Sequence, residues 1–440
     1  MSEKFHVLLI GSGGREYAFL RKLLQAPEVK VTVAPGLSGM LYFLNEEERS
    51  RVTLQPQVKA ADLPAILALA KEIQPDLVVV GPEDPLILGL ADELQAAGFK
   101  VFGFSKPSAQ LEGDKWVCKE TYQGLKLPTA SAILIKDLEE AQWHLRDFAK
   151  DGQFIVLKCV GPALGKGVVI VPTDSPNHWA EQERQISLML SPDKPLGFQA
   201  QAILLEHRYP IINEWSAMSL VGNNGFWLGL MPTKDHKLFN GLNTGGMGIV
   251  SPAPGFCLQD MQTRKAVVGK VRAYMKEFLN ADLCGIFYEG LNRMAGIDYL
   301  VEINARGGDS ETQGQLEFIE GVPLHEILLA AVEGRPEILN RVTVPQDKVL
   351  VGVVMASKGY PGSYQKGKEI IVPEKLPAPG LIFPAGLVWQ DGKLLTAGGR
   401  VLMPVGIGKS VAEAREHAYE IVRSIQHDGA LVWRENIGAD

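Results

Sequence analysis

The segment VEINARGGDSETQ, residues 301–313, carries the most informative polar side chains of the sequence. Glu302 and Asn304 are spaced i and i+2, so on a strand both side chains point to the same face. Two oxygen donors at one point suit a hard cation such as Mg²⁺ or Mn²⁺. Arg306 follows Asn304 closely, and its guanidinium fork can grip a carboxylate or a phosphate. The pattern indicates a metal site beside an anion clamp, with a solvated strand edge as the alternative.

The loop GSGGRE, Gly11–Glu16, lies between an expected strand and an expected helix. Free backbone N–H groups and the helix dipole favour an anion at such a place, so the loop can bind a phosphate. A dinucleotide fingerprint requires a third glycine where this chain has Glu16, which disfavours that interpretation. A tight turn that merely needs glycine torsions is the alternative.

The loop GPALGKG, Gly161–Gly167, only superficially resembles a Walker phosphate-binding loop. It has one residue too few between Gly161 and Gly165, and Gly167 stands where Ser or Thr would bind magnesium. The flanking segments are also predicted as two strands, so a Walker NTPase is disfavoured. A glycine hairpin that carries Lys166 can still fold over a triphosphate, because its amides and its ammonium neutralise charge. An exposed turn is the alternative.

The run NTGGMG, Asn243–Gly248, offers amide groups that can line a ligand, although such a run alone is more often a turn. Asp235, His236 and Lys237 lie just upstream, and His236 is given no catalytic role on its residue type. The sequence contains no GxSxG, HExxH or kinase catalytic-loop pattern. The sequence therefore gives no evidence of a protein nucleophile.

Alternating strands and helices are predicted to position the first of these loops. The expected strands of the first hundred residues are Phe5–Ile10, Val29–Ala34, Asp76–Gly81 and Lys100–Phe104. The expected helices between them are Arg15–Gln25, Asp62–Gln74 and Pro85–Ala97. Strict alternation predicts a parallel sheet with covered faces, and ligands of such sheets bind at the carboxyl ends of the strands.

From about residue 106 the pattern changes, and Phe154–Cys159 and Val168–Pro172 are expected to form a hairpin around the GPALGKG loop. Further expected strands are Ala202–Glu206, Trp215–Val221, Phe226–Pro232, Tyr299–Asn304, Val349–Ala356, Glu369–Val372 and Leu394–Thr396. The expected helices are Met261–Leu279, Gln315–Glu320 and Val411–Ile425. The proline-rich stretch Pro373–Pro384 is expected to be a loop.

The composition is that of a soluble globular protein, with 46% apolar and 22% charged residues among 440 and a formal net charge of −7. A mildly acidic chain lacks the concentrated basic face of an obligatory nucleic-acid binder. No apolar run approaches the roughly 20 residues of a membrane helix. We therefore expect a cytoplasmic protein with no nucleic-acid or membrane partner. Its cysteines lack any CxxC spacing and are expected to be buried thiols: Cys118, Cys159, Cys257 and Cys284.

Taken in chain order, the motifs resemble those of the glycinamide ribonucleotide synthetase family, which belongs to the ATP-grasp superfamily. The motifs are GSGGRE, APGLSG, GPEDPL, QLEGDK, VLK, GKG, NTGGMG, VEINARGGDSETQ and ASKGYPGSYQKGKEI. The resemblance implies an α/β protein with an ATP-grasp fold. It implies an N-terminal parallel-sheet (pre-ATP-grasp) domain at 1–106, an ATP-grasp body at 107–335 with a lid at about 120–195, and a C-terminal α+β domain at 336–440.

The resemblance also implies roles for the residues that match. Those implied to bind ATP are Lys115, Lys158, Gly165, Lys166, Gly167, Glu206 and Glu214, and those implied to bind Mg²⁺ or Mn²⁺ are Glu302 and Asn304. Those implied to bind substrate are Gly13, Arg15, Glu16, Glu83, Asn243, Thr244, Gly245 and Gly246. Arg306 and Asp235 are implied to lie at the reacting groups.

The chain departs from the family pattern mainly on the substrate side. Tyr17, Leu37, Val160 and Pro384 stand where the family usually has His, Asn, Asp and His, and the stretch between Lys237 and Asn243 is short. The implied activity is an ATP-dependent ligase that joins a small carboxylic acid and an amine through an acyl phosphate, in purine biosynthesis, as a monomer or homodimer. The alternatives are a relative recruited to another acid and amine, and a catalytically silent nucleotide-binding protein.

Overall fold

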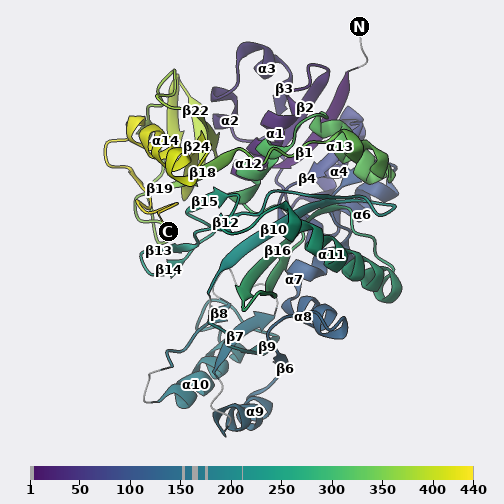
Figure 1. Ribbon diagram of the computed structural model, residues 1–440, viewed down its shortest axis with the longest axis vertical. Helices are drawn as coiled ribbons and strands as arrows, with labels where there is room; N and C mark the ends of the chain where they lie inside the picture. Colours follow the sequence, from purple (N-terminus) through teal and green to yellow (C-terminus); the bar gives the residue numbers. More distant parts are fainter. Residues whose placement is uncertain (1–3, 151–153, 161–166, 174–176, 211, 440) are drawn as a thin grey trace.

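The computed structural model describes residues 4–150, 154–160, 167–173, 177–210 and 212–439 (Figure 1). Parallel strands form the N-terminal sheet, and antiparallel pairs predominate in the sheets that follow. Within these ranges, no helix combines the length and the apolar character that crossing a membrane requires.

The N-terminal strands form the predicted parallel sheet, in the order β3-β2-β1-β4-β5. These strands are β1 (Phe5–Gly11), β2 (Val29–Pro35), β3 (Val52–Leu54), β4 (Leu77–Val80) and β5 (Val101–Phe102). The apolar run of β1 is buried on both faces, as a parallel sheet covered by helices requires. The loops that follow β1, β2 and β4 therefore meet at one edge of the sheet, as the alternation predicts.

Helices cover this sheet and connect its strands: α1 (Gly14–Leu23), α2 (Gly39–Tyr42), α3 (Glu46–Ser50), α4 (Leu63–Ile73), α5 (Glu83–Leu88) and α6 (Leu90–Ala96). The prediction of one helix over Pro85–Ala97 is wrong, because Gly89 adopts a positive φ of +103° and divides it in two. Such a conformation suits glycine, which has no Cβ to clash. The division places Glu83 in the first turn of a short helix.

The central sheet is antiparallel, in the order β11-β10-β16-β17. Its elements are β10 (Glu214–Val221), β11 (Trp227–Gly229), β16 (Gly285–Met294), β17 (Ile297–Asn304), α11 (Leu258–Leu279) and α13 (Leu324–Glu333). The prediction of a helix over Gln315–Glu320 is wrong, since α12 spans Glu311–Gln315 and a 3-10 turn follows at Leu316–Phe318. A second 3-10 segment spans Pro336–Arg341.

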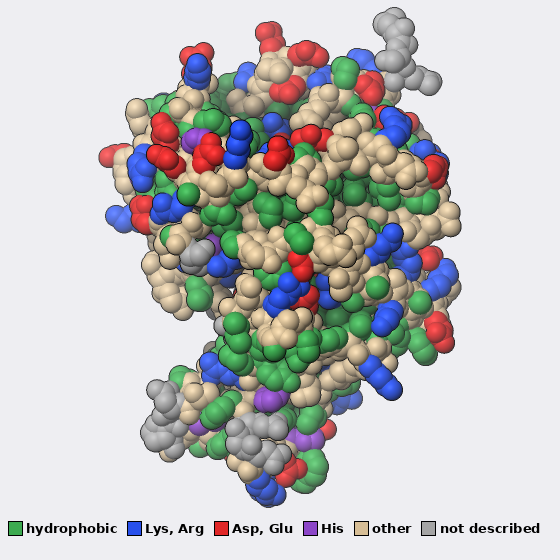
Figure 2. Space-filling view, viewed as in Figure 1, with side chains coloured by type: hydrophobic (Ala, Val, Ile, Leu, Met, Phe, Trp, Pro, Cys, Tyr) green, Lys and Arg blue, Asp and Glu red, His purple; other side chains and the backbone are tan. Residues whose placement is uncertain are grey.

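A smaller sheet, in the order β6-β9-β7-β8, projects below the rest of the molecule (Figure 1). The molecule narrows between this unit and the body above it (Figure 2). Its strands are β6 (Ala132–Ile135), β7 (Ile155–Val160), β8 (Val168–Val169) and β9 (Ala202–His207), and its helices are α9 (Leu138–Lys150) and α10 (His178–Leu190). The predicted hairpin is confirmed, because β7 and β8 pair antiparallel. Helices α7 (Lys106–Gly113) and α8 (Lys115–Gly124) connect the unit to the N-terminal sheet.

The C-terminal sheet includes two short strands from the middle of the chain, and its order is β12-β15-β18-β24-β19-β25 with β21 beside β24. Its elements are β12 (Lys234–Asp235), β15 (Gly248–Ser251), β18 (Val349–Val353), β19 (Met355–Ser357), β21 (Gly380–Pro384), β24 (Arg400–Gly408), β25 (Leu431–Val432) and α14 (Val411–Ser424). The prediction of a loop over Pro373–Pro384 is wrong where β21 pairs with β24. Smaller elements are β13 (Leu238–Phe239), β14 (Leu242–Asn243), β20 (Glu369–Ile370), β22 (Leu387–Gln390) and β23 (Lys393–Thr396).

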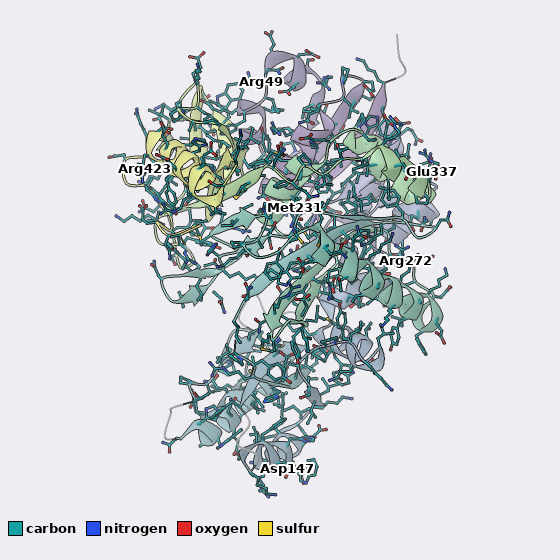
Figure 3. The ribbon with its side chains drawn as sticks, in the orientation of Figure 1. Arg49, Asp147, Met231, Arg272, Glu337 and Arg423 are labelled. Atoms are coloured by element: carbon teal, nitrogen blue, oxygen red, sulfur yellow. The ribbon has the colours of Figure 1, made fainter. Side chains whose placement is uncertain are left out.

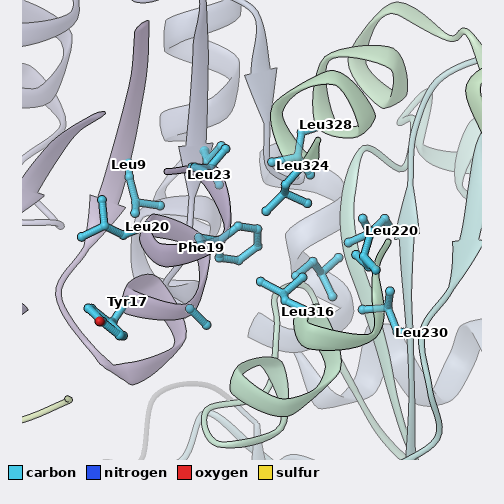
Figure 4. Close-up of a cluster of buried hydrophobic side chains, with 14 of the residues drawn as sticks. Leu9, Tyr17, Phe19, Leu20, Leu23, Leu220, Leu230, Leu316, Leu324 and Leu328 are labelled. Atoms are coloured by element: carbon cyan, nitrogen blue, oxygen red, sulfur yellow. The ribbon is translucent and has the colours of Figure 1, made fainter. Parts of the chain in front are cut away.

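One hydrophobic core joins the N-terminal sheet to the central sheet (Figure 4). Phe19 and Leu23 of α1 face Leu316 and Leu324, which follow β17 in the chain. This packing fixes the GSGGRE loop relative to the end of β17. Among the cysteines, Cys257 is exposed, which corrects the prediction of four buried thiols.

Candidate active site

The GSGGRE loop folds around the side chain of Glu16, which is 2% exposed. Gly13 N–H donates to Glu16 Oε2 at 2.6 Å, and Arg15 Nε donates to Glu16 Oε1 at 2.6 Å. A Cβ at Gly81 would lie 2.2 Å from Glu16 Oε1, so only glycine leaves room for this carboxylate at the end of β4. Glu16 thus ties together the loops that follow β1 and β4.

Two arginines from distant segments approach the same oxygen of Glu83. Arg306 Nε lies 3.3 Å and Arg15 Nη1 lies 3.8 Å from Glu83 Oε2, and Arg15 also donates to Gly307 O at 2.9 Å. Burial alone would raise the pKa of Glu83, but the two guanidinium groups outweigh it and hold that pKa below its usual value. The structure therefore brings together three of the residues singled out in the sequence.

The side chains of Glu302 and Asn304 leave the same face of β17, at the end of that strand. Lys237 Nζ donates to Glu302 Oε1 at 3.1 Å and to Glu214 Oε1 at 3.2 Å, so one ammonium links two predicted site carboxylates. This ammonium is the main cause that lowers the pKa of Glu302. The Glu302 side chain is still 46% exposed, which leaves its oxygens within reach of a ligand.

Asn304 faces Glu112, a residue of α7 that sequence reasoning missed. In the amide orientation that satisfies its hydrogen bonds, Asn304 donates to Glu112 Oε1 at 3.2 Å. Arg306 Nη2 lies 3.0 Å from the same oxygen, and Ala305 N–H donates to Glu112 Oε2 at 2.8 Å. Burial raises the pKa of Glu112 to about 7, against the opposing effect of Arg306.

Lys158 and Lys119 hold opposite oxygens of Glu206. The distances are 2.6 Å from Lys158 Nζ to Oε1 and 2.9 Å from Lys119 Nζ to Oε2. Lys119 is 3% exposed, and burial lowers its pKa. Lys158 also contributes to the lowered pKa of Glu302, so the lysines and the predicted metal ligands share one electrostatic environment.

Two further predicted nucleotide ligands, Lys115 and Gly167, lie near this pair. Lys115 begins α8 and lies within electrostatic reach of Cys159 on β7. The carbonyl of Gly167 accepts a hydrogen bond from Cys159 N–H at 2.6 Å. Gly165 and Lys166 lie outside the described residues, so their proposed contact with phosphate stays a prediction.

The NTGGMG run closes over Asp235 at the edge of the C-terminal sheet. A Cβ at Gly246, where φ is +105°, would lie 2.8 Å from Asp235 Oδ1 and 2.9 Å from Ser310 Oγ. Burial and then the charge of Glu311 raise the pKa of Asp235 well above its usual value. Thr244 N–H and Oγ1–H both donate to Lys237 O at 2.8 Å, which fixes the run against the segment that follows β12. Asn243 is exposed at the end of the β13–β14 hairpin.

Arg400 of β24, also missed from the sequence, connects the C-terminal sheet to this run. It donates to the backbone carbonyls of Gly245 and Asp309, and its Nη2 lies 3.0 Å from Asp309 Oδ2. A small pocket lies beside it. Its polar wall includes Ser310 and Gln313, whereas β21 and β24 supply an apolar wall.

Two departures from the family pattern lie beside this apolar wall. The Tyr17 ring is fully buried and meets the Phe383 ring edge-on, with 6.1 Å between centroids, directly before Pro384. Burial raises the pKa of Tyr17. Tyr17 and Phe383 thus form an apolar contact between α1 and β21, and Pro384 is the next residue of that strand.

The structure gathers most of the predicted residues around the end of β17. Met231, at the centre of Figure 3, lies in the segment between β11 and β12 that leads to Asp235. The functional candidates missed from the sequence are Glu112, Lys119, Lys237 and Arg400. For Lys119, the signal was its spacing of four residues from Lys115, which places both on one side of α8. No group of three or more His, Cys, Asp or Glu suited to a metal occurs within the described ranges.

Comparison with known families covers nearly the whole chain. Three models of phosphoribosylglycinamide synthetase match: the N domain at residues 5–112, the ATP-grasp (A) domain at 113–312 and the C domain at 350–440. Two similar relatives are phosphoribosylamine–glycine ligases. The one from Halalkalibacterium halodurans is 35% identical over 99% of this chain and 96% of its own. The one from Haemophilus influenzae is 35% identical over 98% and 97%.

Solved structures agree with this assignment. The phosphoribosylamine–glycine ligase of Thermotoga maritima superposes with a TM-score of 0.77 at 29% identity, over 98% of this chain and 100% of its own. The biotin carboxylase domain of Hydrogenobacter thermophilus 2-oxoglutarate carboxylase, solved with MgADP, ADP and bicarbonate, gives 0.75 at 15% identity over 100% and 95%, which is a likeness of fold. The predicted ATP-grasp fold class is confirmed, and the chain belongs to the phosphoribosylglycinamide synthetase family.

Proposed function

We propose that the chain is an ATP-dependent C–N ligase that joins glycine to phosphoribosylamine. The observation that carries this proposal is the assembly at the end of β17, where Glu302, Asn304 and Arg306 meet Arg15 and Glu83 of the N-terminal sheet. The assembly offers ligands for a cation beside an arginine for a carboxylate. Its relatives named phosphoribosylamine–glycine ligase, matched over almost their full length, support the substrate pair.

ATP and a divalent cation are the common requirements of ATP-grasp ligases, and we propose Mg²⁺, or Mn²⁺, as the cation here. The donor set fits, because Glu302 is accessible and the Asn304 carbonyl oxygen faces away from Glu112. Mg²⁺ characteristically takes few protein ligands and completes its shell with phosphate oxygens and water. When bound, the cation neutralises charge on the phosphates of ATP. For the nucleotide, we propose Lys115, Lys158, Glu206, Glu214 and the Gly165–Gly167 loop.

In this proposal, the acid is first activated, because a carboxylate is a poor electrophile. A carboxylate oxygen of glycine takes the γ-phosphoryl group of ATP, which gives an acyl phosphate and ADP. Arg306 orients the carboxylate, and Lys158 stabilises the negative charge of the transferring group. Such positioning and electrostatics supply most of the catalysis in phosphoryl transfer.

The amide forms in the second step. The amine nitrogen of phosphoribosylamine attacks the acyl carbon, the bond from that carbon to the phosphate oxygen breaks, and inorganic phosphate leaves. Asp235, which lies against the NTGGMG run, is the proposed acceptor of the amine proton. The NTGGMG run covers Asp235. In this proposal, the same run keeps water away from the acyl phosphate.

The other predicted site residues complete the proposal. Gly13, Arg15, Glu16 and Glu83 would receive the amine substrate and its phosphate, and Asn243–Gly246 would line the reacting groups. The domain limits at 1–106, 107–335 and 336–440, with a lid at about 120–195, stay predictions. So do the cytoplasmic location and the monomeric or homodimeric state.

The test is to mix the protein with ATP, MgCl₂, glycine and phosphoribosylamine and to measure ADP and the mass of the product. One amide per ADP supports the proposal. Turnover only with another acid and amine would identify a relative recruited to other substrates. ATP binding without ADP release, across a panel of acids and amines, would identify a silent nucleotide-binding protein.

A further inference from the structure

One carboxylate of α7 contacts three successive residues at the end of β17. Glu112 Oε1 lies 3.2 Å from the amide nitrogen of Asn304 and 3.0 Å from Arg306 Nη2. Glu112 Oε2 accepts the backbone N–H of Ala305 at 2.8 Å. The segment held in this way carries both a proposed cation ligand and the proposed carboxylate clamp.

Glu112 is largely enclosed, since its side chain is 11% exposed. Enclosing an ionised carboxylate is costly unless it is paired and hydrogen-bonded, and here three donors meet its two oxygens. Glu83 lies close enough to raise the electrostatic cost further, because it shares Arg306 with Glu112. A neutral side chain of the same shape would escape this cost, so stability alone does not explain why a carboxylate stands here.

The contact with Asn304 sets the direction of its side chain. A side-chain amide has two donor hydrogens on nitrogen and acceptor lone pairs on oxygen, at opposite ends of one planar group. Because the nitrogen faces Glu112, the oxygen must point away from α7. That orientation presents an oxygen, rather than a nitrogen, on the face that Asn304 shares with Glu302.

The contact of Glu112 with Arg306 leaves two N–H groups of the guanidinium available for a ligand. A guanidinium has five N–H groups. Within the described residues, Nη2 faces Glu112, Nη1 donates to Gly307 O at 3.2 Å, and Nε faces Glu83. One N–H therefore remains on each terminal nitrogen, and such a pair matches the two oxygens of a carboxylate.

We infer that Glu112 is a positioning residue, which orients the Asn304 oxygen toward the cation and the Arg306 fork toward the acid substrate. The identity of the acid in this inference rests on the proposed function. The expected effect of Glu112 on cation binding does not depend on that function. Glu112 touches neither substrate nor reacting atoms in this account. It acts through the two side chains that do.

The substitution Glu112→Gln tests the inference because it keeps the shape and removes one acceptor. If the new amide oxygen accepts Ala305 N–H, the amide nitrogen faces Asn304, which must then turn its own oxygen toward α7. If the amide is placed the other way, two N–H groups oppose each other at Ala305. Either result withdraws the Asn304 oxygen from the cation or disturbs the end of β17.

The measured quantity is the affinity for Mn²⁺ in the presence of ADP. Electron paramagnetic resonance of the free ion monitors the binding. This measurement needs no turnover, so it separates failure of the inference from failure of the proposed ligase activity. We expect the Kd for Mn²⁺ to rise about tenfold or more in Glu112→Gln, as for other groups that orient a metal ligand. The melting temperature of Glu112→Gln shows whether the variant is folded.

Glu289→Gln is the matched control. Glu289 is also buried and also pairs with an arginine, Arg264, together with Tyr122. It pairs in register with Ile303, so its side chain lies on the face of the sheet opposite to Glu302 and Asn304. We expect this variant to lower the melting temperature and to leave the Kd for Mn²⁺ within about twofold of the unchanged chain.

Two results would overturn the inference. The first is a Kd for Mn²⁺ in Glu112→Gln that stays within twofold of the unchanged chain while the variant is folded. The second comes from a double-mutant cycle that compares Glu112→Gln, Asn304→Ala and the variant that carries both substitutions. Because Glu112 acts on the cation through Asn304, adding Glu112→Gln to Asn304→Ala should change the Kd little, and full additivity of the two effects contradicts the inference.

Discussion

Arg400 holds Asp309 through both the backbone and the side chain of that residue, although 91 positions separate them in the sequence. The same guanidinium reaches the carbonyl of Gly245, so one arginine of the C-terminal sheet joins the NTGGMG run to the segment that follows Arg306. The position of the NTGGMG run beside the site thus depends on β24, a strand that contributes no proposed substrate ligand.

Arg400→Lys is expected to lower kcat about tenfold or more while the fold is kept. A lysine preserves the charge but lacks the planar fork that serves two carbonyls and a carboxylate at once. Arg400→Ala should also destabilise the protein by about 1.5–3 kcal/mol, because it removes a charged donor from two backbone carbonyls and from the half-buried Asp309. Steady-state kinetics and chemical denaturation check the two effects, and a lysine variant with full activity would contradict the role of Arg400.

Glu302→Ala is expected to abolish turnover and to change the free energy of unfolding by less than about 0.5 kcal/mol. The side chain is 46% exposed and forms an ion pair with the ammonium of Lys237, so little packing is lost. ADP release at saturating ATP and MgCl₂, compared with a denaturation curve, measures both. A normal rate would refute the assignment of Glu302 as a cation ligand.

Lys119→Met is expected to raise the KM for ATP about tenfold. It removes one of the two ammonium groups on Glu206, so the remaining lysine, Lys158, is drawn more strongly toward that carboxylate and away from phosphate. Lys150→Met on α9 is the control, since Lys150 is 75% exposed and, among the described residues, forms an ion pair only with Asp147 on its own helix. If the two variants have the same KM for ATP, Lys119 has no part in nucleotide binding.

Gly81→Ala is expected to destabilise the protein by about 1–3 kcal/mol and to weaken the use of the amine substrate. The added Cβ would lie 2.2 Å from Glu16 Oε1, so Glu16 must leave its place in the GSGGRE loop. Gly269→Ala is the control, because a Cβ there meets nothing within 4 Å in the middle of α11. The free energy of unfolding of Gly269→Ala should increase by about 0.5–1 kcal/mol because alanine has the higher helix propensity. An equal loss of stability in both variants would contradict the account of Glu16.

The N-terminal sheet could be predicted because its signals are local. Its apolar strand runs end at glycine or proline, and its helices have the period of an amphipathic surface. By contrast, β16 was missed because GIFYEGLNRM mixes apolar and charged residues. Its Glu289 is tolerated in the interior only through Tyr122 and Arg264, which come from α8 and α11. Contacts with residues so distant in the sequence cannot be predicted from a short segment of the chain.

The candidate site shows the same contrast between local signals and contacts of distant residues. Glu302 and Asn304 were predicted as site residues because their spacing on one strand is itself the signal, and Arg306 because it follows them closely. Glu112 was not, because its partners lie 193 positions away at Ala305 and its neighbours in α7 look like an ordinary helix end. Arg400 was missed for the same reason. Residues that act through other side chains become visible only when the fold places them together.

The central claim is that the acid becomes an acyl phosphate before the nitrogen attacks, and oxygen transfer tests it most directly. Glycine labelled with ¹⁸O in its carboxylate, incubated with ATP, MgCl₂, phosphoribosylamine and the protein, should yield inorganic phosphate that carries one labelled oxygen for each amide formed. Mass spectrometry of the phosphate gives this ratio. Amide formation with unlabelled phosphate would contradict the account.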